Sequence, residues 1–91
     1  MSYIPPEESL IEYPSEFPIK VMGKNNPDFA QIITEVVVKY DPSFDASNVE
    51  MRPSSKGNYM GLTFRITATS RQQLDDLYRE LHAHPMVSIV L

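Results

Sequence analysis

The chain has 91 residues, which fits one small domain, since single domains commonly run to roughly 100–150 residues. Its content of 42% apolar and 22% charged residues is typical of a globular protein and excludes an intrinsically disordered chain. A net charge of −4 disfavours nucleic acid and anionic lipid as partners, and the lack of cysteine excludes disulfides and thiolate chemistry.

Residues 1–9 contain two prolines and two glutamates without periodicity, which predicts a mobile acidic tail ahead of a single domain at residues 10–91. The start of the chain lacks the basic-then-apolar order of a signal peptide. No apolar run approaches the roughly 20 residues that a membrane span needs. We therefore expect a cytoplasmic protein that does not enter the membrane.

The first half of the domain predicts a strand followed by a helix. Residues 17–22 alternate between apolar and other side chains, as in a strand that buries one face. Gly23 breaks this pattern, and Asn26 followed by Pro27 predicts the start of a helix, with Asn26 as its cap. The helical stripe consists of Phe29, Ile32, Ile33, Val36 and Tyr40. The helix should end at residues 41–42, because a residue before proline is disfavoured in the α region.

The second half predicts two strands, a helix and a closing strand. Residues 48–52 alternate with Val49 and Met51 on the core side, and residues 59–68 carry a longer apolar face. Ser70 and Gln73 predict a capping box at the start of the second helix. That helix buries Leu74, Leu77, Tyr78 and Leu81 and ends before Pro85. In the closing strand, residues 87, 89 and 91 are predicted to face the core.

The order βαββαβ predicts an α+β fold of ferredoxin-like type, with a four-stranded antiparallel sheet of order 4-1-3-2 and both helices on one face. The other face of the sheet is then uncovered. Its predicted residues are Lys20, Met22, Glu50, Arg52, Tyr59, Gly61, Thr63, Arg65, Thr67, Ser88 and Val90.

At residues 20–23 (Lys-Val-Met-Gly) and 53–59 (Pro-Ser-Ser-Lys-Gly-Asn-Tyr) the chain resembles the YbeD-like family of small bacterial proteins. The similarity runs from about Leu10 to Leu91, and residues 1–9 lie outside it. The resemblance implies a ferredoxin-like fold similar to the ACT-type domains that bind small effectors and regulate enzymes. It implies no catalytic activity and supplies no functional residues.

The connection at residues 53–59 contains two serines, Lys56 and Gly57, but it is not a phosphate loop. A phosphate loop needs glycine, four residues and then Gly-Lys-Ser/Thr before a helix, whereas a strand follows here. One interpretation is a hairpin connection in which Gly57 or Asn58 takes a positive φ. The alternative is an anion or partner contact through Ser54, Ser55 and Lys56.

Residues 56–64 also resemble the RNA-recognition strand signature. RNA binding needs several aromatic side chains on the open face, and here Tyr59 is nearly alone there. His82 and His84 lack a suggested third metal ligand, so a structural or surface role is favoured. Asp75, Asp76 and Glu80 are interpreted as solvated helix surface.

The junction between the first strand and the first helix is the candidate site for a small ligand. Backbone N–H groups at a helix start can hold a carboxylate, and Asn25 and Asn26 add donors beside Gly23. The alternative is a glycine turn followed by an ordinary helix cap.

The sequence therefore predicts a regulatory or protein-interaction module without catalytic activity, cofactor or metal, which binds a protein partner or a second copy. The predicted binding residues are Arg52, Ser54, Ser55, Lys56, Tyr59 and Arg65. The alternative function is an ACT-type sensor of an amino acid or other carboxylate at Gly23, Asn25 and Asn26.

Overall fold

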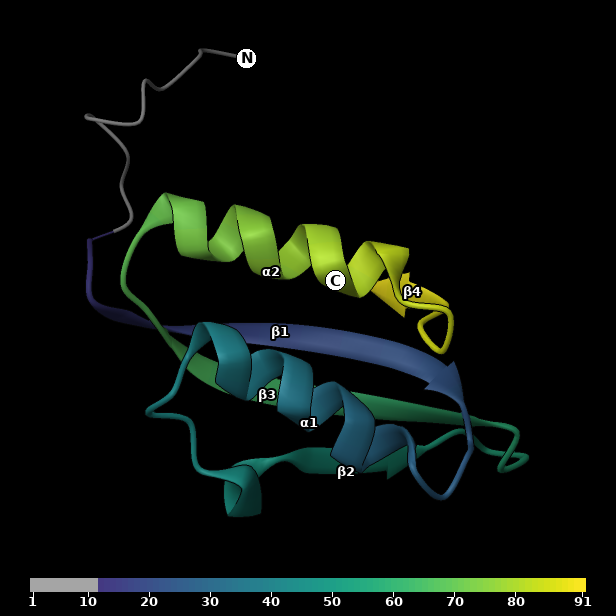
Figure 1. Ribbon diagram of the computed structural model, residues 1–91. Helices are drawn as coiled ribbons and strands as arrows, with labels where there is room; N and C mark the ends of the chain where they lie inside the picture. Colours follow the sequence, from purple (N-terminus) through teal and green to yellow (C-terminus); the bar gives the residue numbers. More distant parts are fainter. Residues whose placement is uncertain (1–11) are drawn as a thin grey trace, which may run out of the picture.

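The computed structural model describes residues 12–91, so the predicted tail at residues 1–9 and the first two residues of the predicted domain lie outside the described part. The chain folds in the predicted order βαββαβ (Figure 1). The elements are β1 (Ser15–Lys24), α1 (Phe29–Tyr40), a short 3₁₀ helix η2 (Ala46–Asn48), β2 (Glu50–Pro53), β3 (Tyr59–Ala68), α2 (Arg71–Ala83) and β4 (Ile89–Val90).

The four strands form one antiparallel sheet in the order β2-β3-β1-β4, which confirms the predicted topology. Its centre is the pair β1 and β3, which stay in register from Ser15 opposite Ala68 to Lys24 opposite Tyr59. Alternate residues of these strands are buried beneath the two helices. They are Ile19, Val21, Leu62, Phe64, Ile66 and Ala68, each at most 1% exposed. The fold therefore has one helical layer and one open sheet face.

Helix α1 begins at Phe29, two residues later than the sequence predicts. Asn26 does not cap this helix; its side-chain oxygen accepts from the Asp28 N–H at 2.8 Å, and its carbonyl oxygen accepts from the Phe29 N–H at 3.0 Å. Asn26 thus closes a turn ahead of the helix. The valines at the end of α1 are helical despite their strand propensity, because Val36 and Val37 extend the buried stripe against the sheet.

Helix α2 begins as predicted, with the Ser70 hydroxyl accepting from the Gln73 N–H at 3.0 Å. The Gln73 side chain returns to the Thr69 N–H, at 2.7 Å, and not to Ser70. Its amide nitrogen also donates to the carbonyl oxygens of Tyr40 and Thr67. One side chain therefore connects the start of α2 to the ends of α1 and β3.

Asp41 is the buried polar residue of the described core, at 3% exposure. It follows α1, and one carboxylate oxygen accepts from the Thr67 N–H at 2.8 Å. The other oxygen accepts from the N–H and the hydroxyl of Ser43. Asp41 therefore fastens the end of α1 to β3.

The predicted facing of the last strand is wrong for residues 89–91, although Val87 packs against the core as predicted. Val87 does not enter the ladder, because its N–H bonds the carbonyl oxygen of His84 in a turn. Pairing begins at the N–H of Ser88, and Val90 then lies opposite the buried Val21 and packs against the core. Ile89 and Leu91 consequently lie on the open face.

Met51 is predicted in the core and is instead 59% exposed. It lies opposite Leu62 and so points to the helical side of the sheet, but β2 is the edge strand and α1 does not cover it. An apolar hollow of about 680 Å³ results between α1 and β2, lined by Ala30, Val38, Val49 and Met51 among others.

Candidate functional site

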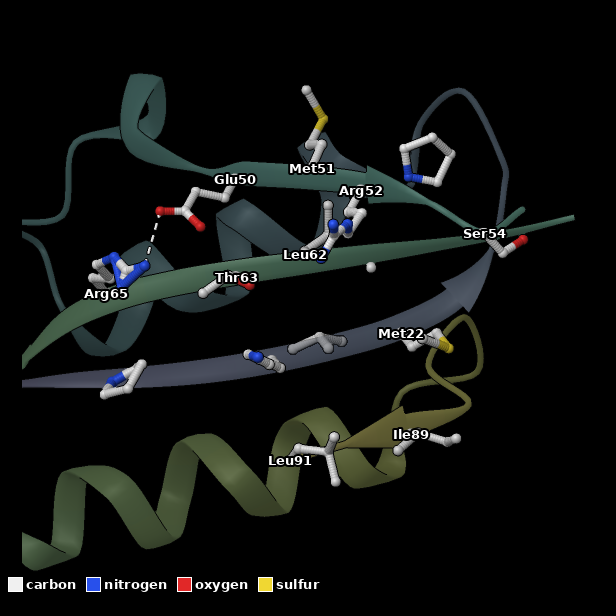
Figure 2. A pocket seen from close by; sticks show the side chains of 15 residues that line it. Met22, Glu50, Met51, Arg52, Ser54, Leu62, Thr63, Arg65, Ile89 and Leu91 are labelled. Carbon is white, nitrogen blue, oxygen red and sulfur yellow. Dashed lines mark ion pairs between the residues drawn. The ribbon is translucent and has the colours of Figure 1, made fainter. Parts of the chain in front are cut away.

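The open face of the sheet is the candidate functional site, and its residues come from all four strands. One row runs across the sheet from Ile89 through Met22 and Gly61 to Arg52, because the strand register places these residues opposite one another. A parallel row holds Lys20, Thr63 and Glu50. These residues line a shallow hollow of about 790 Å³. Figure 2 shows the side chains of Ile89, Met22, Arg52, Thr63 and Glu50 around it.

Apolar side chains gather at the β4 edge of this face. Met22 is 40% exposed, Ile89 is 51% exposed and Leu91 is 73% exposed. Leu91 extends the ladder beyond β4, because it exchanges two backbone hydrogen bonds with Lys20. We call these three side chains the apolar shelf (Figure 2). Met22 is predicted on this face, whereas the alternation of residues 87–91 predicts Ile89 and Leu91 on the core side.

The open face is basic although the whole chain is acidic. The strands contain the basic residues Lys20, Lys24, Arg52 and Arg65, and the acidic residues Glu16 and Glu50. Arg65 is neutralised by Glu50, with 3.0 Å between the guanidinium and the carboxylate. Within residues 12–91 no carboxylate lies within ion-pair distance of Lys20, Lys24 or Arg52. The face therefore presents uncompensated positive charge beside the apolar shelf.

The connection between β2 and β3 is a closed hairpin turn. The sequence predicts a positive φ at Gly57 or Asn58, and it is Gly57 that has one, at +75°. The Ser54 hydroxyl accepts from the Tyr59 N–H at 3.1 Å, so its oxygen is used by the turn itself. Ser55 and Lys56 are exposed at the tip, and their side chains make no hydrogen bond or ion pair with the described residues.

The six predicted binding residues divide into separate groups. Arg52 lies on the edge strand β2, opposite Gly61, and Tyr59 lies at the end of β3, opposite Lys24. Arg65 is six residues along β3 from Tyr59, which is about 20 Å on an extended strand. The structure therefore does not bring Arg65 together with Tyr59. Sequence analysis missed Ile89 and Leu91, which the structure adds to this surface.

The predicted ligand site at the β1–α1 junction lies against the hairpin turn. Asn25 donates its side-chain amide to the carbonyl oxygen of Gly57 at 3.0 Å, and its N–H to that of Asn58 at 3.0 Å. A Cβ atom at Gly23 would lie 2.2 Å from the Met86 carbonyl oxygen and 2.7 Å from the Phe29 ring. Gly23 thus permits close packing, and the Asn25 donors already have partners within the protein.

The perturbed titratable groups lie in the helical layer, away from the open face. Glu80 accepts from the Tyr40 hydroxyl at 2.6 Å and forms an ion pair with Lys39. The bond from Lys39, followed by that from Tyr40, lowers the pKa of the Glu80 carboxyl. The bond to Glu80 raises the pKa values of Lys39 and Tyr40. This cluster joins α1 to α2 and favours charged Glu80, which is a structural arrangement.

The two histidines have separate neighbours. The His82 ring stacks on Tyr78 with 6.3 Å between centroids, and His84 accepts from the Met86 N–H at 3.1 Å. No group of three potential metal ligands occurs within the described residues. In the same part of the chain, no helix has the length and apolar character needed to cross a bilayer.

The fold and this surface define a small ferredoxin-like α+β domain with an uncovered basic and apolar sheet face. The chain belongs to the family described as "Protein of unknown function (DUF493)", whose model matches residues 8–91. It is 74% identical over 91 residues to the UPF0250 protein BPP0168 of Bordetella parapertussis, covering 100% of both chains. It is 64% identical over 87 residues to the UPF0250 protein RSc0326 of Ralstonia nicotianae, covering 96% of this chain and 90% of the relative.

The solution structure of protein HP0495 from H. pylori matches the fold with a TM-score of 0.74, covering 100% of this chain and 98% of the other. The sequence identity is 13%, so this likeness shows the fold alone. These findings confirm the predicted YbeD-like family and the ferredoxin-like fold.

Proposed function

We propose that this protein is a protein-interaction module that binds a partner through the open face of its sheet. The observation that carries the proposal is the apolar shelf of Met22, Ile89 and Leu91 on the same face of the sheet as Arg52, a cation without an ion-pair partner in residues 12–91. Exposed apolar area rimmed by charge is typical of interaction surfaces. The hairpin tip with Lys56 borders this face and extends the proposed contact.

We propose that the module acts without catalysing a reaction. In support, the described residues with shifted pKa values that interact with one another are Lys39, Tyr40 and Glu80. They bind one another between the two helices, and none of them lines the hollow of the open face. A turnover that is lost on a single substitution would overturn this part of the proposal.

The test of the proposed function is capture of partners by the immobilised protein from an extract of its own organism. Met22→Asp places a carboxylate in the apolar shelf and should abolish capture. Met22 is 40% exposed, so the fold should tolerate the change. Gln72→Asp introduces the same side chain on the exposed surface of α2 and is the matched control. Proteins that bind the wild type and the control but not Met22→Asp support the proposal, whereas partners unaffected by Met22→Asp refute it.

A small-carboxylate sensor at Gly23, Asn25 and Asn26 remains a second prediction, but the geometry favours it less. The Asn25 amide donates to Gly57, and the Asn26 oxygen accepts from Asp28. Thermal-shift screening with amino acids and other carboxylates tests this function, because a ligand that binds the folded state raises the melting temperature. Stabilisation that disappears in Asn25→Ala would establish it.

A further inference from the structure

Gly61 lies at the middle of the open face, and the backbone does not require glycine there. Within residues 12–91 the glycine with positive φ is Gly57. A Cβ atom added at Gly61 would meet the carbonyl oxygen of Arg52 at 3.4 Å, which is an ordinary contact. Glycine in the interior of a strand weakens the strand, because it has high conformational freedom and no side chain to pack. The structure of the isolated chain therefore gives no reason for glycine at this position.

The effect of Gly61 is a gap in the side chains of the open face. Met22 stands on one side of it and Arg52 on the other, since both residues pair with Gly61 across the sheet. Gly61 and both flanking residues line the same shallow hollow (Figure 2). The gap thus has one apolar wall and one basic wall.

The charge around this gap selects its occupant. Arg52 and Lys20 have no ion-pair partner in the described part of the chain, so a carboxylate on the occupant would gain a charge-assisted contact. A second copy joined face to face would instead place two surfaces with the same excess of cations against each other, which is unfavourable. A single-stranded nucleic acid would need stacking aromatics, and Tyr59 at the end of β3 is the exposed aromatic of this face.

We infer that the gap at Gly61 accommodates an aliphatic side chain from an acidic segment of a partner protein. In this arrangement the aliphatic group fills the gap against Met22 and Ile89, and a neighbouring carboxylate of the segment pairs with Arg52. The inference rests on the proposed function of the open face and specifies the chemistry of the partner. A larger residue at position 61 would fill the gap and exclude the aliphatic side chain of the partner, which explains glycine at this position.

The experiment selects peptides from an unbiased displayed library of random dodecamers on the folded wild-type protein. The selected peptides are then synthesised and their affinities measured by fluorescence anisotropy at low and high salt. We expect enrichment of Asp and Glu beside Leu, Ile or Val, with binding that weakens at high salt. Arg52→Glu should weaken binding at least roughly tenfold. Arg71→Glu makes the same charge change on α2 and should leave affinity unchanged.

Gly61→Thr provides the decisive variant, because threonine favours strands and fills the gap. We expect an unchanged or higher melting temperature together with at least roughly tenfold weaker peptide binding. Gly61→Ala, with a smaller side chain, should show an intermediate loss. Full affinity in a folded Gly61→Thr protein would overturn the role of Gly61.

The outcomes separate the two levels of the proposal. If Met22→Asp leaves the binding of every selected peptide unchanged, the open face is not the interaction surface and the proposed function fails. If Met22→Asp abolishes binding but the peptides are not acidic or ignore Arg52→Glu, the inference alone fails. Displacement of the peptide by a single-stranded RNA dodecamer, or a concentration-dependent dimer lost in Met22→Asp, would also overturn the inferred partner.

Discussion

Asn25 and Gly57 are joined by a 3.0 Å hydrogen bond from the Asn25 side-chain amide to the Gly57 carbonyl oxygen, across 32 residues of sequence. A backbone bond from Asn25 to Asn58 accompanies it. The end of β1 and the β2–β3 turn therefore form one unit at the rim of the open face. This unit fixes where the tip residue Lys56 stands relative to the sheet.

Removal of the Asn25 amide tests that connection. Asn25→Ala should lower the free energy of unfolding by about 1 kcal/mol, the typical net value of one hydrogen bond. The measurement is equilibrium urea unfolding. Asn58→Ala is the matched control, because its side chain makes no hydrogen bond within residues 12–91. Equal losses in the two variants would contradict a special role for the Asn25 side chain.

The glycines at positions 23 and 61 should respond in opposite ways to the same added methyl group. Gly23→Ala forces a Cβ atom to within 2.2 Å of the Met86 carbonyl oxygen, so we expect a loss of about 3 kcal/mol or more. Gly61→Ala should be neutral or stabilise by about 0.5 kcal/mol, because the site has room and the unfolded chain loses freedom. Thermal and urea unfolding of both variants check this contrast; similar losses would refute the packing role assigned to Gly23.

Asp41 and Asp45 make similar local contacts in different environments. Each carboxylate accepts from the N–H and hydroxyl of the serine two residues later, but Asp41 is buried and also holds the Thr67 N–H. Asp41→Ala should cost about 3 kcal/mol, because it leaves partly buried N–H groups without an acceptor. Asp45→Ala should cost about 1 kcal/mol or less. Urea unfolding of the two variants tests the difference, and a cost at Asp45 equal to that at Asp41 would contradict it.

The Glu80 cluster predicts a specific dependence of stability on pH. The bonds from Lys39 and Tyr40 hold the folded-state pKa of Glu80 below its ordinary value of 4.5. A carboxyl with a lowered folded pKa stabilises the fold fully above its unfolded pKa, and this contribution is lost as the pH falls through the folded pKa. The stability difference between wild type and Glu80→Gln should therefore be constant near neutrality and shrink as the pH falls below about 4.5.

Lys39→Met provides the partner variant for this prediction. It removes the largest cause of the lowered Glu80 pKa, so the stability difference that depends on Glu80 should become smaller in the Lys39→Met background. Urea unfolding from pH 3 to pH 7 checks both statements. A difference between wild type and Glu80→Gln that stays constant throughout this range would contradict the assignment.

The sequence was informative where a pattern extended over many residues. Residues 59–68 alternate through five apolar positions, and β3 has the predicted bounds and facing. The closing strand is short, with two residues assigned to β4, so its alternation could not decide the register. That register depends on the turn from His84 to Val87 and on the contact between Gly23 and the Met86 carbonyl oxygen, which are tertiary features.

The candidate site was predictable in outline and not in its contacts. The parity of β1 and β3 placed Lys20, Met22 and Arg65 correctly on the open face. The pairing of Asn25 with Gly57 joins distant residues, so no local pattern indicates it. Exposure of Met51 follows from the position of β2 at the sheet edge beyond the cover of α1, which depends on helix placement rather than on residue alternation.

The position of Leu91 has a practical consequence for handling the protein. Leu91 is paired with Lys20 and its side chain lies on the open face, so anything fused after it departs from the edge of that surface. An affinity tag or reporter at this end would compete sterically with a binding partner. A tag placed before residue 12 would instead be joined to the chain near the start of β1. That end of β1 pairs with Ala68 and lies away from Arg52. A false negative in an interaction assay could therefore arise from the choice of terminus alone.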